Sequence, residues 1–302
     1  MITEKSLKKP FWSSWWIAAR PKTLTSALVP VVVGTLLAYS KGVYMNWSIP
    51  FFALASALCI NIATNLINDS LDFKKGADTH ERLGPTRATQ SGLLPFAQVY
   101  WGGIIFFGLA ILFGIPLVIK GGYPLLIVLV ASIISGYIYT GGPYPLSYKG
   151  LGDFFVFIFF GFVATLSVFY LQTGYLAKEA WLAGAQIGLL DTVLIAINNL
   201  RDVAGDAKSN KKTLPVRFGK TFGRLEITFL VMASFLLGFA WLSWGYFYAG
   251  ILPWLAFPVA LRLMRDIWTT EPSRAFNAFL GKASLLLVLF GISLSIGFLL
   301  KG

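Results

Sequence analysis

Long runs of apolar residues alternate along this chain with short segments that hold most of its charged residues. A helix needs about 20 apolar residues to cross a bilayer, and lipid tolerates only helices or closed barrels. The runs are too long and continuous for barrel strands, so the pattern predicts an all-α integral membrane protein with about nine transmembrane helices. We expect these helices over residues 25–40, 48–67, 98–119, 122–140, 152–173, 180–200, 222–244, 246–264 and 279–300.

The composition agrees with a membrane location. Of the 302 residues, 56% are hydrophobic and only 13% are charged, whereas a soluble domain has about 25% charged residues. A chain of this size cannot bury so much apolar surface, and the excess is expected to face lipid. The single cysteine, Cys59, excludes an internal disulfide, and the single histidine, His80, excludes metal sites that need several imidazoles.

The distribution of charge predicts the orientation of the chain. If the N-terminus is cytoplasmic, the cytoplasmic segments contain 21 of the 25 lysines and arginines. Basic residues concentrate on the cytoplasmic side of membrane proteins, so we expect the N-terminus inside and the C-terminus outside. Orientation and anionic headgroups then account for the net charge of +12, and no nucleic acid partner is expected. We expect one transmembrane domain over residues 1–302, in which residues 1–20 form a cytoplasmic or interfacial segment.

A polar stripe marks the cytoplasmic end of the second apolar run. Asn65 and Asp69 are four residues apart and Asp72 follows three residues later, so all three lie on one face of a helix. Asn68 falls beside them, and Asp78 follows shortly after the expected end of the helix. The stripe therefore brings amide and carboxylate oxygens together at the membrane surface.

A second stripe ends the sixth apolar run. Asp191, Asn198 and Asp202 are spaced seven and four residues apart, again on one helix face. Asp206 lies one further turn along the same face if the helix continues past Gly205. Asp191 is the deepest of these residues, because it lies inside a predicted span.

The two stripes end on the same predicted side of the membrane. Oxygen-only ligands suit Mg²⁺, which binds carboxylates, water and substrate phosphates. Lysines and arginines interleave with the stripes, and a metal together with cations indicates a diphosphate ligand. Either stripe alone is equally well explained as a solvated helix end. Two stripes that reach back into apolar runs favour a functional site, because polar groups at membrane depth are costly.

At the two aspartate motifs the sequence resembles the UbiA superfamily of intramembrane aromatic prenyltransferases. Four stretches resemble most closely the branch of that superfamily that prenylates 1,4-dihydroxy-2-naphthoate in menaquinone biosynthesis, and the second stretch continues from 68–78 into 82–92. The six-residue gap between Asp72 and Asp78 is similar to that branch. The stretches are RPKT (20–23), NDSLDFKKGAD (68–78), RLGPTRATQSG (82–92), YTGGPYPLSYKGLGDFFVFIFFG (139–161) and NNLRDVAGDAKSNKKTLPVRFG (198–219).

The resemblance implies a nine-helix bundle around a central cavity, with Mg²⁺ as cofactor and a long polyprenyl diphosphate as donor. It implies that the aromatic acceptor loses its carboxyl group as CO₂ and that pyrophosphate leaves, giving a demethylmenaquinol or demethylmenaquinone. It also implies a bacterial cytoplasmic membrane as the location, with the active site facing the cytoplasm.

The candidate site residues follow from the two stripes and the similar stretches. The expected metal ligands are Asn65, Asp69, Asp72, Asp78, Asp202 and Asp206. The expected catalytic residues are Asp69, Asp72, Asp202, Asp206, Lys149 and Asp191. The expected substrate-binding residues are Asn65, Asn68, Arg87, Asn198, Arg201 and Lys212 at the diphosphate, Arg20 and Lys22 at the acceptor carboxylate, and Tyr139 and Tyr148 beside an allylic cation.

Three other interpretations remain open at this point. The same chemistry on 4-hydroxybenzoate or homogentisate would use the same metal motifs. A cation-coupled transporter would use Asp191 and the aspartate clusters as ion sites, although transporters bind substrates near the bilayer midplane. A non-catalytic membrane scaffold is the third interpretation, but it leaves the two carboxylate stripes unexplained.

Overall fold

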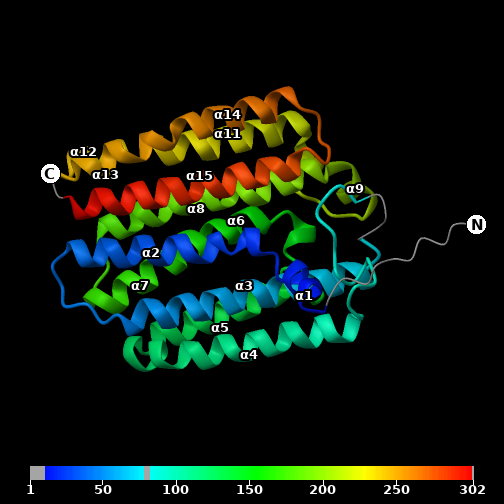
Figure 1. The fold of residues 1–302 in the computed structure, drawn as a ribbon, viewed down its shortest axis with the longest axis horizontal. Coiled ribbons are helices and arrows are strands. Elements are labelled where there is room, and N and C mark those ends of the chain that lie inside the picture. The colour runs from blue at the N-terminus through cyan, green and yellow to red at the C-terminus, as the bar shows by residue number, and fades with distance from the viewer. Residues whose placement is uncertain (1–10, 78–81, 301–302) are drawn as a thin grey trace, which may run out of the picture.

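The computed structural model describes residues 11–77 and 82–300, and within these ranges it contains helices and loops but no strand. The long helices run side by side in one bundle (Figure 1). The predicted all-α architecture is therefore confirmed. The first half of the chain forms α1 (Phe11–Ala19), η1 (Pro21–Thr23), α2 (Thr25–Ser40), α3 (Ser48–Lys74), α4 (Phe96–Gly121), α5 (Tyr123–Ile138), η2 (Ser147–Lys149), α6 (Gly152–Val156), the π-helical segment η3 (Phe157–Val163) and α7 (Ala164–Thr173).

The second half continues with the same kind of element. It forms α8 (Lys178–Arg201), α9 (Val203–Lys208), α10 (Leu214–Phe218), α11 (Lys220–Leu236), α12 (Phe239–Ser243), α13 (Phe247–Ile251), η4 (Leu252–Ala256), α14 (Phe257–Thr269) and α15 (Phe276–Leu299). Each of the nine predicted apolar runs thus coincides with a helix or with consecutive helices.

Within the described ranges, fewer than nine helices are long and apolar enough to cross a membrane. Among the described residues, seven helices are long and apolar enough to span a bilayer, or eight if the bent pair Phe11–Thr23 and Thr25–Ser40 forms one span. The remaining apolar helix, α5, has only 16 residues, and a span needs about 20. A ninth crossing by α5 stays a prediction.

The two ends of the bundle carry different connections. α1, the last turns of α3 and α8, and α9 gather at one end, and the α4–α5 hairpin and the end of α15 lie at the other (Figure 1). The first and last described helices thus end on opposite sides of the bundle, as expected. The side of the membrane that each end faces stays a prediction.

Helix α8 is the most enclosed of the long helices. It packs against α2, α11, α15 and η3, and 78% of its apolar window is buried, against 33–44% for the other six long spans. Close approach depends on glycine: a Cβ on Gly161 would lie 2.6 Å from the carbonyl oxygen of Gly184 and 2.6 Å from the Cα of Gly188. Small residues at such contacts let two helix backbones meet.

The chain turns at Asp202 and does not continue as one helix through Gly205. α8 ends at Arg201, Asp202 leaves the helical conformation with φ −92° and ψ 8°, and α9 begins at Val203. The apolar run stops here and Gly205 follows, so little burial or propensity supports a longer helix. Asp206 therefore belongs to a separate short helix and not to the stripe on α8.

Candidate active site

A charged cavity of about 460 Å³ lies at the end of the bundle where α3 and α8 terminate. It is the place where the two sequence motifs meet, although they are more than 100 residues apart in the chain. Its lining includes the carboxylates of Asp72, Asp153, Asp202 and Asp206, and the cations of Arg20, Lys22, Arg82, Arg87, Arg201 and Lys211.

A second cavity of about 290 Å³ continues from the first into the bundle. Leu117, Val128, Phe155 and Phe159 are among its many apolar lining residues. The two cavities share the lining residues Arg20, Thr23, Asn68, Tyr139, Leu194, Ile195 and Asn198. A polar chamber and an apolar one therefore meet at a junction, and a molecule with a charged head and a hydrocarbon tail fits such a pair.

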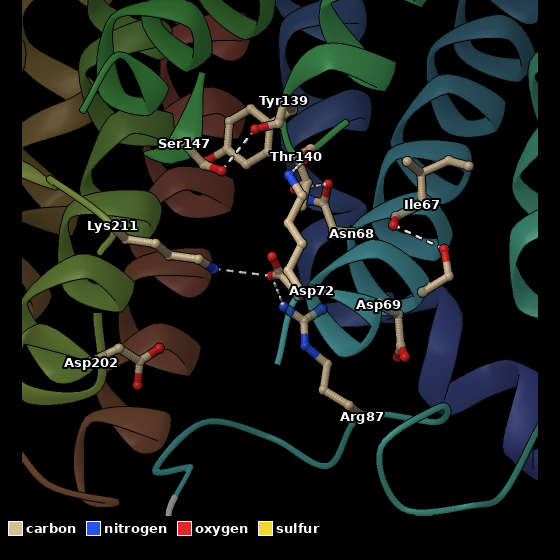
Figure 2. Close-up of polar contacts among 12 residues, drawn as sticks. Ile67, Asn68, Asp69, Asp72, Arg87, Tyr139, Thr140, Ser147, Asp202 and Lys211 are labelled. Atoms are coloured by element: carbon tan, nitrogen blue, oxygen red, sulfur yellow. Dashed lines mark hydrogen bonds and ion pairs between the residues drawn. The ribbon is translucent and has the colours of Figure 1, made fainter. Parts of the chain in front are cut away.

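Asp72 is the anionic centre of the charged cavity (Figure 2). Its Oδ2 lies 3.3 Å from Nη2 of Arg87 and 3.1 Å from Nζ of Lys211. Its Oδ1 accepts a hydrogen bond of 3.0 Å from the hydroxyl of Tyr148. The residue is only 2% exposed, so these contacts are weakly screened by solvent.

Asp202 faces the same cavity from the α8 side. The guanidinium of Arg201 binds both of its carboxylate oxygens, with Nε 2.8 Å from Oδ1 and Nη2 2.6 Å from Oδ2. The remaining Nη1 of Arg201 donates to the side-chain oxygen of Asn277 at 2.8 Å, and Asn277 in turn donates to the carbonyl of Leu83. Arg201 is 1% exposed. Its contacts join α8 to α15 and to the 82–87 loop, and it also lines the cavity.

Asp206 completes the set of carboxylates from α9. Burial, and secondarily the nearby carboxylates of Asp202 and Asp72, raises the pKa of Asp206 to about 7, and the cation of Lys211 counteracts the rise. Tyr139, at the junction, is partly buried and lines both cavities. Like any tyrosine with an ordinary or higher pKa, it is a neutral hydrogen-bonding group and a ring at physiological pH.

Other residues of the first stripe point elsewhere. Both carboxylate oxygens of Asp69 accept backbone N–H groups, from Ala88 and Thr89 at 2.9 Å each. The side chain of Asp69 leaves α3 in a different direction from that of Asp72 (Figure 2). The amide of Asn65 contacts the 19–23 segment and lines only the apolar cavity. Asn68 lies at the junction, where its side-chain oxygen accepts a short hydrogen bond from Thr140.

Two lysines that we expected in the site are placed outside it. Lys149 is exposed, and its ammonium lies 4.8 Å from the ring centre of Tyr144. Lys212 is exposed as well, and only its backbone is fixed, through Tyr148 and Arg217. Neither lysine lines the charged cavity or the apolar one. Lys211, one residue earlier in the chain, is the lysine that reaches Asp72.

The remaining predicted residues divide between the chambers. Arg20 lines both, and Lys22 lines the charged one. Asn198 lines both, while its amide nitrogen donates to the carbonyl of Leu194 in its own helix. Tyr148 lines neither cavity, but supports the site through its hydrogen bond to Asp72. Asp78 lies outside the described residues.

Asp191 stands apart from the charged cavity. It is 1% exposed and lines the apolar cavity with Ser26. Ser26 is near enough to interact with the carboxyl group, but neither carboxyl oxygen has a partner at hydrogen-bonding geometry among the described residues. About 16 Å of helix separate Asp191 from Asp202 at 1.5 Å per residue, and Asp191 does not line the charged cavity.

The charged cavity is also lined by Asn277 and Asn199, which were not among the expected site residues, and by Asp153, for which the resemblance implied only a possible site-lining role. The amide of Asn199 donates to both oxygens of Asp153, at 3.2 and 3.1 Å. Asn199 adjoins the second stripe, and the glycines before Asp153 belong to a similar stretch, so both positions carried a weak signal. Asn277 begins an apolar helix and carried none.

The donor set of the charged cavity fits Mg²⁺. No three Asp, Glu, His or Cys residues in ranges 11–77 and 82–300 form a metal site by themselves. Mg²⁺ usually binds one or two carboxylates and completes its shell with water and substrate phosphates, and Asp72, Asp202 and Asp206 offer such carboxylates. Burial raises the pKa of Asp206, and a bound cation would stabilise its charged form.

The fold and the paired cavities define a membrane-embedded helical bundle with a charged chamber that opens into an apolar one. The chain belongs to the UbiA prenyltransferase family, and the match spans residues 27–294. The family expected from the sequence motifs is thereby confirmed.

Curated relatives are similar over most of their length. The chain is 32% identical to 1,4-dihydroxy-2-naphthoate octaprenyltransferase of Haemophilus influenzae, over 95% of this chain and 96% of the relative. It is 36% identical to the Escherichia coli protein of the same name, over 77% of each chain. These relatives confirm the resemblance to the naphthoate branch.

Solved structures share the fold. A UbiA homolog from Aeropyrum pernix, in its apo form, superposes with a TM-score of 0.66 at 15% identity and covers 93% of this chain and 98% of its own. A UbiA homolog from Archaeoglobus fulgidus, bound to DMAPP and Mg²⁺, superposes with a TM-score of 0.58 at 15% identity over 94% and 99% of the two chains.

Proposed function

We propose that this protein transfers a polyprenyl group from a polyprenyl diphosphate to 1,4-dihydroxy-2-naphthoate, releasing pyrophosphate and CO₂ and giving demethylmenaquinol. The observation that carries the proposal is the junction between a charged and an apolar cavity in a chain of this family. The acceptor follows from five relatives named 1,4-dihydroxy-2-naphthoate octaprenyltransferase, which are 31–36% identical.

The charged cavity binds the diphosphate in this proposal. Arg82, Arg87 and Lys211 supply cations that bind phosphate oxygens. Asp72, Asp202 and Asp206 are the carboxylates that would hold Mg²⁺, the ion bound with DMAPP in the Archaeoglobus structure. Bound there, Mg²⁺ supplies positive charge beside the departing pyrophosphate.

The junction is where the reacting carbon atoms meet. The prenyl chain extends into the apolar cavity, so the allylic carbon lies beside Tyr139, whose neutral ring offers its π face to a developing cation. Apolar walls keep water from the cation. Arg20 and Lys22 line the adjacent wall and are our candidates for the acceptor carboxylate. The prenyl group replaces that carboxyl group, so CO₂ leaves in place of a ring proton.

The proposed location follows from the charge distribution. The cavity opens at the end of the bundle that carries the loops of both motifs, and most basic residues belong to the segments at this end. We infer a bacterial cytoplasmic membrane with this end toward the cytoplasm.

The decisive experiment uses the purified protein in detergent or bilayers with octaprenyl diphosphate, Mg²⁺ and radiolabelled 1,4-dihydroxy-2-naphthoate. We expect a labelled prenyl quinol together with pyrophosphate, and no product in EDTA. Parallel reactions with 4-hydroxybenzoate and homogentisate serve as acceptor controls. Product with one of those acceptors only would overturn the acceptor assignment, and no product with any acceptor would overturn the reaction class.

A further inference from the structure

Helix α3 sends its buried polar side chains in three directions. Asn68 and Asp72 line the charged cavity, whereas Asp69 does not line either cavity and Asn65 lines only the apolar one. All four residues are at most 7% exposed. Asp69 and Asn65 each contact backbone or hydroxyl groups of a different segment outside α3, and Asn65 also donates to the side chain of Asn61 in α3. Each of these two segments carries an arginine of the charged cavity.

Asp69 binds the loop that carries Arg87. Its two carboxylate oxygens accept the N–H groups of Ala88 and Thr89, each at 2.9 Å. These N–H groups begin a turn over residues 87–92, in which Ser91 and Gly92 bond back to Arg87 and Thr89. An anion at this position satisfies N–H groups that the turn itself leaves without acceptors. The same loop then places Nη2 of Arg87 3.3 Å from Asp72.

Asn65 binds the loop that carries Arg20. Its amide nitrogen lies 3.1 Å from the carbonyl oxygen of Ala19 and 3.0 Å from the hydroxyl of Thr23, so it holds the chain on both sides of Arg20. Asn61 adds a hydrogen bond to the carbonyl of Thr23. Arg20 has φ 54° and ψ 67°, a left-handed conformation that a non-glycine residue keeps only when its surroundings hold it.

We infer that Asn65 and Asp69 are positioning residues that hold these two loops, and that they are not magnesium ligands. Of the first motif within the described residues, only Asn68 and Asp72 present their side chains to the charged cavity. We call the contacts of Asp69 with residues 88–89 and those of Asn65 with residues 19–23 the two clamps. Removing either clamp leaves the carboxylates of the cavity in place but lets the arginine of the released loop move. The inference deepens the proposed function and rests on it where it assigns these arginines to the substrates.

Amide hydrogen exchange tests the Asp69 clamp without any turnover. In Asp69→Asn one acceptor of the two N–H groups is replaced by a donor, so peptides covering residues 87–92 are expected to exchange about tenfold faster. Asp266→Asn is the matched control, since Asp266 pairs with Lys282 between α14 and α15, and exchange at 87–92 should not change. Unchanged exchange in Asp69→Asn would overturn the inference. Asn65→Ala tests the other clamp on peptides covering 19–24, and it decides the matter if Asp69→Asn does not fold.

Kinetics distinguish a positioning residue from a metal ligand. Asp69→Asn should raise the KM for polyprenyl diphosphate about tenfold while the Mg²⁺ concentration for half-maximal activity stays within about twofold of wild type. Asp72→Asn should shift the Mg²⁺ requirement itself. An equal shift in both variants would make Asp69 a ligand and end the inference. If wild type forms no prenylated product, the exchange result still decides the clamp, and the failure belongs to the proposed function.

Discussion

The Asp206 carboxyl group couples the stability of the protein to pH. The folded state raises its pKa to about 7 through burial, and an unfolded chain has a value of about 3.9. The folded state therefore binds the proton more tightly. The resulting stabilisation is complete below about pH 4 and is lost as the pH rises through about 7.

We expect Asp206→Asn in EDTA to be more stable than wild type at pH 8, by about 1–3 kcal/mol. The amide never carries the buried charge, so the difference should vanish near pH 4. Thermal unfolding in detergent at both pH values measures it. Equal stabilities at pH 8 would show that Asp206 is better solvated or better paired than the cavity suggests.

Asp191 offers a second test at the level of one side chain. A buried polar group without a hydrogen-bond partner costs about 1–3 kcal/mol, and both oxygens of Asp191 lack one among the described residues. Asp191→Leu should therefore unfold at the same temperature as wild type or higher. Leu190→Ala, at a neighbouring site that is 1% exposed, should lose about 2–5 kcal/mol. A clear loss in Asp191→Leu would identify a structural hydrogen bond.

The sequence indicated which kinds of side chain line the charged cavity, but not which lysine reaches Asp72. The interleaved cations were evident, but Lys211 and Lys212 are adjacent, and only the turn after α9 decides that Lys211 reaches Asp72. The placement of Asp69 was beyond prediction for another reason. Its partners are backbone N–H groups of a loop 19 and 20 residues away, and a backbone group leaves no signature in the sequence.

Helices were the most predictable elements. The expected run over 180–200 became α8 at Lys178–Arg201, because a long apolar run in a bilayer has few alternatives to a helix. The turn at Asp202 was not predictable, since a polar segment beyond the membrane is free of that constraint. The helical spacing of the stripes therefore holds inside α3 and α8 but does not extend to Asp206, which lies on the separate helix α9.

The contact between η3 and α8 should depend on glycine at position 161, where any side chain would meet the backbone of α8. A methyl group on Gly161 would lie 2.6 Å from backbone atoms of Gly184 and Gly188, which cannot move without shifting α8. We expect Gly161→Ala to lose about 1–3 kcal/mol and to unfold at a lower temperature. Gly108→Ala is the matched control, because nothing lies within 4 Å of a Cβ there. Equal melting temperatures would mean that the two helices adjust without strain.

The orientation of the protein in the membrane is a property of the whole molecule. It can be tested by labelling single cysteines introduced after the lone native cysteine has been replaced. In a Cys59→Ser background, a cysteine in place of exposed Tyr175 should react with an impermeant maleimide on intact cells. A cysteine in place of exposed Ala207, on α9, should react only after the membrane is opened. This pattern follows from the concentration of basic residues at the α9 end. The reverse pattern would place the charged cavity outside the cell.

The junction between the two cavities has a consequence for how the reaction ends. In the proposed reaction, the allylic C–O bond breaks where the chambers meet, so besides CO₂ the two parts of the amphiphilic donor end in two products with opposite solubilities. Pyrophosphate partitions into water, and the prenylated ring, having lost both the diphosphate and its carboxylate, partitions into the bilayer. The surrounding lipid is then the receiving phase for one product, and the rate of turnover becomes a function of how much membrane is available to dissolve it.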